Sequence, residues 1–160
     1  MARGEARAAA RLAAVQALYQ MELAGTPLSE VKAEFESHWI GREVEGERYN
    51  PADTALFRDI LDGVLRDQRA IDRDVDATLA SGWPLKRIEA ILRAVLRAGT
   101  FELIGRPDVP ARVVISEYVD VASAFVERDE AGMVNAVLDT LARKLRPGEL
   151  DPPARGAAAR

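Results

Sequence analysis

The sequence predicts an all-α protein of about six to seven helices, arranged as two packed helical halves of one domain. Apolar residues recur along most of the chain at the three- and four-residue spacing of core-facing helices. No segment sustains the period-two alternation that is typical of a half-buried strand. The length of 160 residues suits a single domain with a sizeable core.

The first half of the chain, residues 1–82, is predicted to hold three helices. The first covers residues 5–24 and ends at Gly25 and Pro27, which interrupt helices. The second covers residues 28–39. The apolar side of the first helix consists of Leu12, Val15, Leu18, Tyr19 and Leu23.

A polar, glycine-containing segment at residues 40–50 separates the second helix from the third and is predicted to be a loop. Asn50 is a suitable N-cap and Pro51 a suitable first-turn residue, so a long third helix begins there. It is predicted to end at Ser81-Gly82. The apolar stripe shifts near Asp67–Ala70, which predicts a bend in this helix.

The second half, residues 83–146, starts at Trp83-Pro84 and is predicted to hold three more helices. Their apolar stripes are Ile88, Ile91, Leu92, Val95, Leu96 and Leu103; Val114, Tyr118, Val121, Ala122 and Phe125; and Val134, Val137, Leu138, Leu141 and Leu145. Asp129 stands where an N-cap of the last helix is expected. Residues 147–160 are rich in Pro, Gly, Ala and Arg, which predicts a flexible tail.

The composition predicts a cytoplasmic protein. Hydrophobic residues make up 48% and charged residues 30%, as in ordinary globular domains. The absence of cysteine excludes disulfides and thiolate zinc sites and fits a reducing compartment. Charged residues near the N-terminus interrupt any signal-peptide core, and no apolar run approaches the length of a membrane span.

Motifs for catalysis or metal binding are incomplete. His38 is the only histidine, which excludes a multi-histidine metal site and a histidine-based catalytic pair. Asp72, Asp74 and Asp76 imitate the start of a calcium-binding loop, but Ala77 stands where that loop requires glycine. We therefore expect a protein that is not an enzyme, with no cofactor and no metal site.

The net charge of −4 is distributed unevenly. Residues 53–76 hold four arginines and seven aspartates, a local charge of −3, which disfavours RNA on that helix. Arg3, Arg7 and Arg11 recur every four residues, which places them near one face of the first helix. Such a row can pair with successive phosphates of a single strand, or it can be a solvated helix start.

Residues 95–141 carry an ordered set of matches to one protein family. The matched positions are Leu96, Arg97, Phe101, Glu102 and Leu103; Asp108 to Pro110, Val113, Ile115 and Glu117; and Val134, Asn135, Val137 to Asp139 and Leu141. This pattern resembles the C-terminal half of the NusB family of bacterial antitermination and ribosomal-RNA processing factors. In the first helix, Ala14–Tyr19 match the family's "A.QALY" motif.

The resemblance implies a NusB-like helical fold and a role in RNA binding. NusB proteins carry an arginine-rich segment before the "A.QALY" motif, and this segment helps to bind the boxA element of transcripts. Arg3, Arg7 and Arg11 stand in that segment, whereas Ala8–Ala10 fill positions where several relatives have arginine. Weaker RNA affinity and a weaker salt dependence are therefore expected.

Other positions carry over from the same resemblance. Tyr19 matches a tyrosine at the family's RNA surface, where a ring can stack on an unpaired base; a core aromatic is the equally open alternative. Asp129 and Met133 match a second RNA-contacting patch. Asp129 can accept hydrogen bonds from base edges or merely cap its helix. Met133 replaces an aromatic residue and Gly132 a basic one, which predicts weaker stacking.

Four polar residues interrupt the apolar stripes and are predicted to bridge helices by hydrogen bonds, because buried polar groups need partners. They are Arg97, Glu102, Glu117 and Asn135. Their match to the family does not require that they contact RNA.

The resemblance implies a non-catalytic antitermination factor that binds boxA-type single-stranded RNA with NusE, a small-subunit ribosomal protein, during ribosomal-RNA transcription. Its setting would be the RNA polymerase antitermination complex, away from any membrane. Residues from about 84 to 126 are expected to supply much of the NusE surface, and a homodimer remains open. One alternative is a protein-only helical adaptor, favoured by the few arginines and the acidic pI. Another is an RNA-binding module related to those of rRNA cytosine methyltransferases.

Overall fold

The computed structural model describes residues 3–39, 43–44, 47–48, 51–79 and 88–150. Within these ranges the chain forms six helices: α1 (Arg3–Ala24), α2 (Leu28–Trp39), α3 (Pro51–Thr78), α4 (Ala90–Gly105), α5 (Ala111–Ser123) and α6 (Arg128–Leu145). The all-α prediction is confirmed. None of the described helices is long and apolar enough to cross a lipid bilayer.

A minimal hairpin lies inside the segment predicted to be a loop. Glu43–Val44 (β1) pairs antiparallel with Glu47–Arg48 (β2). Two-residue strands are too short to show a periodic pattern, so this pairing had no signal in the sequence.

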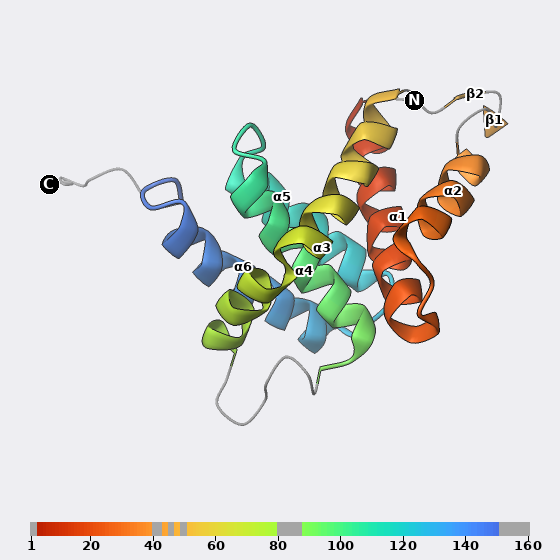
Figure 1. Ribbon diagram of the computed structural model, residues 1–160. Coiled ribbons are helices and arrows are strands. Elements are labelled where there is room, and N and C mark those ends of the chain that lie inside the picture. Colours follow the sequence, from red (N-terminus) through yellow and green to blue (C-terminus); the bar gives the residue numbers. More distant parts are fainter. Residues whose placement is uncertain (1–2, 40–42, 45–46, 49–50, 80–87, 151–160) are drawn as a thin grey trace, which may run out of the picture.

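Helix α4 is the centre of the fold (Figure 1). It packs against α1 and α3 on one side and against α5 and α6 on the other, while α2 lies mainly along α1. One continuous hydrophobic core runs through all six helices. Because α4 has neighbours on both sides, its side chains from Leu92 to Leu103 are mostly buried and most of them are apolar.

The predicted bend in α3 is confirmed. Asp67 has φ −109° and ψ 17°, outside helical values, and it divides α3 into two arms. Ile60, Leu61 and Val64 are buried before the bend, and Ile71 and Val75 are buried after it. The bend lets both arms turn their apolar side toward the core.

Two helix starts differ from the sequence prediction. Ile88 is buried but precedes α4, whose N-cap is Glu89. The N-cap of α6 is Glu127, and Asp129 lies in the first turn, so the predicted cap at Asp129 is wrong. The Glu127 backbone N–H donates to Glu130 Oε1 at 3.2 Å, half of a capping box that fixes the start two residues earlier.

A side chain from beyond α6 holds the end of α4. The Arg146 guanidinium donates to the carbonyl oxygens of Glu102, Leu103 and Arg106 at 3.0, 2.8 and 2.8 Å, and to that of Val109 at 2.6 Å. The last carbonyls of a helix have no partner within it, and a cation there also interacts favourably with the negative end of the helix dipole. Arg146 therefore caps α4 from a distant part of the sequence.

The flexible tail was predicted to begin at residue 147, but the described chain stays on the body of the protein as far as Leu150. Gly148 adopts φ +88°, a value that favours glycine, and turns the chain back. Glu149 Oε2 accepts from the Ala111 backbone N–H at 2.5 Å, at the start of α5, and Leu150 packs against the core. The prediction is therefore wrong for residues 147–150, and residues 151–160 lie outside the described part.

Candidate nucleic-acid interface

The arginines predicted to form one row on α1 lie in different environments. Arg7 is half-buried, whereas Arg11 is only 2% exposed. The side chain of Arg3, at the start of α1, lies outside the described residues. The structure thus contradicts the prediction of an RNA-facing row at Arg11.

Helix geometry explains why Arg11 leaves the surface. Four residues exceed one helical turn by about 40°, so two such steps rotate the side chain by about 80° between Arg3 and Arg11. This rotation brings Arg11 to the core side of α1, beside Ala10 and Ala14, both of which are fully buried. The same rotation leaves Arg7 at the edge of that side.

Inside the protein, Arg11 joins α1 to α4 and α5. Its Nε and Nη2 donate to the two carboxylate oxygens of Glu102 at 2.7 and 3.0 Å, and its Nη1 lies 3.4 Å from Glu117 Oε1. The Tyr118 hydroxyl donates to Glu102 Oε2 at 2.5 Å. Glu102 is fully buried, so it accepts three short hydrogen bonds in place of water. We call Arg11, Glu102, Glu117 and Tyr118 the α1–α4–α5 network.

The network alters the ionisation of two of its members. Burial alone would lower the pKa of Arg11, but the hydrogen bonds and the negative charge of Glu102 outweigh it and raise that pKa. Burial raises the pKa of the Tyr118 hydroxyl well above its ordinary value, and the neighbouring Glu102 carboxylate raises it further. Arg11 therefore stays charged and Tyr118 stays protonated under ordinary conditions.

Arg7 lies in the field of an acidic residue of the α4–α5 turn. Burial would raise the pKa of Asp108, but its backbone hydrogen bond and the charge of Arg106 lower it, with a smaller contribution from Arg7. Arg106 also pairs with Asp59 of α3 at 3.0 Å. The charge of Asp108 is thus offset mainly by Arg106, whose Nε lies 3.3 Å from Asp108 Oδ1.

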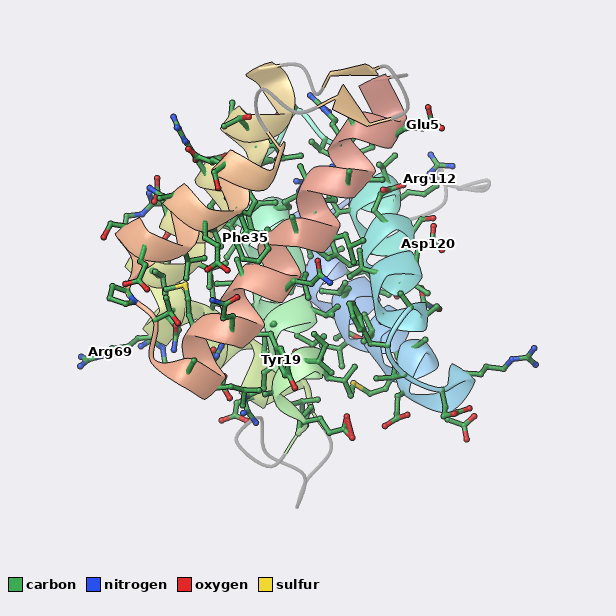
Figure 2. The ribbon with its side chains drawn as sticks, turned by 90° about the vertical axis from the view of Figure 1, so that its right-hand side faces the viewer. Glu5, Tyr19, Phe35, Arg69, Arg112 and Asp120 are labelled. Atoms are coloured by element: carbon green, nitrogen blue, oxygen red, sulfur yellow. The ribbon has the colours of Figure 1, made fainter. Side chains whose placement is uncertain are left out.

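Tyr19 lies near the other end of α1 and is 37% exposed (Figure 2). Twelve residues separate it from Arg7, a distance of about 18 Å along the helix. The sequence placed Leu12, Leu23 and Phe125 in core stripes, but these side chains are 36%, 60% and 41% exposed. Their apolar spacing gave no sign of this, because these three side chains lie at the edge of the buried faces rather than within them.

The second predicted patch lies in the first turns of α6. Asp129 is exposed, Met133 is half-buried against the core, and Gly132 is exposed between them. A Cβ atom built on Gly132 meets nothing within 4 Å. A basic side chain placed at Gly132 would therefore meet open space.

Three of the four predicted bridging residues join helices. Glu102 and Glu117 belong to the α1–α4–α5 network. Arg97 of α4 donates to both carboxylate oxygens of Asp72 on α3, at 2.8 and 2.9 Å, and lies 3.1 Å from Glu22 of α1. Asn135 differs: it is exposed on α6 and lines a surface pocket, so the prediction of a buried bridge is wrong there.

Comparison with known proteins decides the family. Residues 8–143 match the profile of the NusB family. The chain belongs to the NusB family. It is 68% identical to the transcription antitermination protein NusB of Bradyrhizobium sp. (strain ORS 278), over 91% of this chain and 87% of that protein.

Solved NusB structures share the fold. A T. maritima NusB structure superposes with a TM-score of 0.75 at 28% identity, covering 89% of this chain and 94% of that one. The NusB chain of a crystal structure of antitermination factors NusB and NusE in complex with double-stranded RNA gives a TM-score of 0.71 at 22% identity, covering 88% and 98%. The latter likeness concerns the fold alone.

Proposed function

We propose that this protein is a non-catalytic transcription antitermination factor that binds boxA-type single-stranded RNA together with NusE during ribosomal-RNA transcription. The observation that carries the proposal is the 68% identity, over nine-tenths of the chain, to a protein named for transcription antitermination. A NusB chain of the same fold has been crystallised with NusE and double-stranded RNA, which supports NusE and RNA as the partners.

The proposed RNA surface runs along α1 from Arg3 and Arg7 to Tyr19 and continues onto α6 at Asp129 and Met133. Arg7 supplies charge for a phosphate, and the exposed ring of Tyr19 offers a face on which a base can stack. Asp129 is exposed and free to accept a hydrogen bond from a base edge. Arg11 acts indirectly, because it fixes α1 against α4 and α5.

Fluorescence anisotropy with a boxA-like RNA and a scrambled RNA, each with and without NusE, tests the proposal. We expect tighter binding to the boxA-like RNA and a further gain when NusE is present. Equal affinity for both RNAs would contradict the proposal that the protein recognises a specific RNA sequence. Absence of any RNA binding, with NusE binding retained, would favour the protein-only adaptor.

A matched pair of variants tests the surface itself. Arg7→Ala removes a positive charge from the proposed surface, whereas Arg69→Ala removes one from α3, where the side chain points into solvent away from α1 (Figure 2). We expect Arg7→Ala to weaken RNA binding. It should also reduce the salt slope, which is the slope of the logarithm of the binding constant against the logarithm of the salt concentration, by about 0.7 in magnitude, the contribution of one phosphate contact on a single strand. Arg69→Ala should leave both unchanged, and equal losses would refute this placement.

A further inference from the structure

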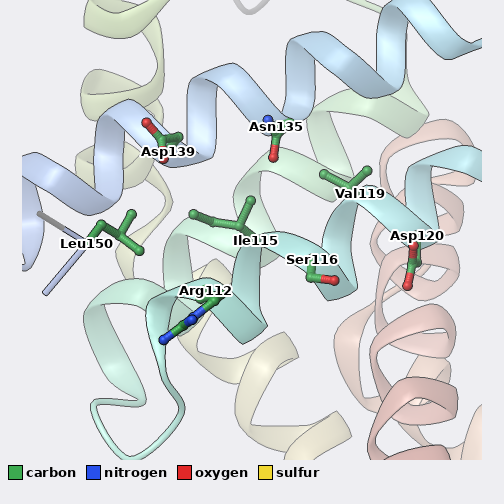
Figure 3. A pocket seen from close by; sticks show the side chains of 8 residues that line it. All are labelled: Arg112, Ile115, Ser116, Val119, Asp120, Asn135, Asp139 and Leu150. Atoms are coloured by element: carbon green, nitrogen blue, oxygen red, sulfur yellow. The ribbon is translucent and has the colours of Figure 1, made fainter. Parts of the chain in front are cut away.

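A surface pocket lies between α5 and α6, beside the place where the described chain ends at Leu150. Its volume is about 380 Å³, and its lining comes from α5, α6 and Leu150 itself (Figure 3). Ile115, Val119 and Leu150 give it an apolar floor. None of its lining residues belongs to the proposed RNA surface.

Two residues of α5 give the two ends of the pocket opposite charges. Arg112 lies at the end nearest Leu150, and Asp120 lies at the far end (Figure 3). Both side chains are exposed. Eight residues of helix separate them, which is about 12 Å. A ligand that fits this groove carries a negative group at its first end and a positive group about 12 Å further on.

The sequence that follows Leu150 has this pattern. It reads Asp-Pro-Pro-Ala-Arg, with Asp151 first and Arg155 four residues later. Consecutive prolines favour the extended polyproline conformation, which rises about 3.1 Å per residue, and in that conformation residues four apart would be spaced by about 12 Å. The order and the spacing of the charges therefore match those of Arg112 and Asp120.

The middle of the groove also suits such a segment. Prolines have carbonyl acceptors but no backbone N–H, so a proline segment needs donors from its binding site. The amide of Asn135 on α6 and the hydroxyl of Ser116 on α5 face this space and can donate (Figure 3). Asp139 is engaged by Arg143 at 2.9 Å, which leaves Asp120 as the carboxylate available to an incoming arginine.

We propose that the α5–α6 groove is a binding site for an extended, proline-containing peptide, and that residues 151–155 of this chain occupy it in cis. Asp151 pairs with Arg112, the prolines and Ala154 cover Ile115 and Val119, and Arg155 pairs with Asp120. The turn at Arg146–Leu150 delivers the segment, because Glu149 is fixed to the start of α5. A partner segment with the same order of charges would have to displace it.

Disulfide trapping in the full chain tests the proposal. The protein has no cysteine, so Ser116→Cys and Ala154→Cys form the single possible intramolecular pair, and non-reducing electrophoresis separates it from disulfide-linked dimers. We expect oxidation to trap this pair readily. Asp120→Arg or Arg155→Asp, added singly, should slow trapping about two- to fivefold, as expected for one exposed ion pair. The two charge reversals together should restore the rate.

Arg160→Asp is the matched control, because it reverses a charge of the same segment outside the proposed register. It should not change the trapping rate. Equal rates in all variants, or a failure of the double reversal to restore trapping, would overturn the proposal. An effect of Arg160→Asp as large as that of Arg155→Asp would show general charge attraction and would also overturn it. Coincident thermal unfolding curves confirm that the variants are folded.

Discussion

Replacement of Arg11 by alanine should destabilise the fold far more than loss of a surface arginine would. In the α1–α4–α5 network, Arg11 and Glu102 are 2% and 0% exposed and are joined by two hydrogen bonds. In Arg11→Ala the Glu102 carboxylate stays buried with only the Tyr118 hydroxyl as its donor. Removing one partner of a buried ion pair costs about 3–5 kcal/mol.

This loss is large compared with a typical unfolding free energy of about 5–15 kcal/mol. For a domain of this size, each kcal/mol lowers the melting temperature by roughly 2–4 °C, so the expected decrease is roughly 6–20 °C. Urea unfolding followed by circular dichroism at 222 nm measures the free energy directly.

A double variant separates the ion pair from simple loss of packing. Arg11→Met combined with Glu102→Gln removes both charges, keeps most of the volume, and leaves an acceptor for the Tyr118 hydroxyl. Because buried ion pairs can be replaced by neutral residues at little cost, it should recover more than half of the stability lost in Arg11→Ala. A free energy of unfolding within about 1 kcal/mol of the parent in Arg11→Ala, together with weaker RNA binding, would show that Arg11 faces RNA and would refute this reasoning.

Three further predictions follow from single positions. Folding raises the pKa of the Tyr118 hydroxyl, so above about pH 10 only the unfolded chain releases this proton. The free energy of unfolding should therefore fall by about 1.4 kcal/mol per pH unit in that range. In urea titrations at pH 9–11, Tyr118→Phe should not show this decrease, because it has no hydroxyl proton to lose. A Cβ on Gly63 would lie 2.0 Å from the Phe101 ring, so Gly63→Ala should lower the free energy of unfolding by about 1–3 kcal/mol. Gly132→Ala, in open space, should raise it by up to about 1 kcal/mol. The opposite ranking of the two variants would contradict this packing. Gly132→Lys should strengthen RNA binding and steepen its salt slope by about 0.7 relative to Gly132→Ala. Anisotropy curves that do not differ between these two variants would show that the α6 patch does not contact RNA.

The fold could be predicted from the sequence because each helix has its own apolar stripe. The shift of the stripe at Asp67 even located the bend in α3. The contacts of residues 146–150 could not be predicted in this way. Arg146 and Glu149 act on the ends of α4 and α5, which are distant in sequence, and no local pattern reports such contacts.

The site was predictable only in part, because one residue type serves two purposes. Arginines four residues apart suggest a surface row, but Arg11 also stands three and four residues before Ala14 and Val15, within the buried side of α1. The carboxylates in the stripes of α4 and α5 gave a second signal. The buried Glu102 needed a cation, and Arg11 reaches both Glu102 and Glu117.

The inward position of Arg11 sets a limit on the electrostatic part of RNA binding. With Arg11 buried, the RNA surface proposed on α1 has Arg3 and Arg7 as its phosphate contacts. Two contacts give a salt slope near −1.4 on a single strand, whereas three would give about −2.1. Affinity must then depend more on stacking at Tyr19 and on a partner protein than on charge.

Anisotropy titrations at several potassium chloride concentrations, without NusE, measure this slope. We expect a value near −1.4 for the parent protein and near −0.7 for Arg7→Ala. The Arg11→Met, Glu102→Gln double variant removes the charge of Arg11 and leaves Arg3 and Arg7 in place, so it should keep the slope at the parent value at temperatures where it remains folded. A parent slope near −2.1 that falls to about −1.4 in this variant would mean that the α1–α4–α5 network opens when RNA binds, because a charge at residue 11 contributes to the slope only when it contacts a phosphate.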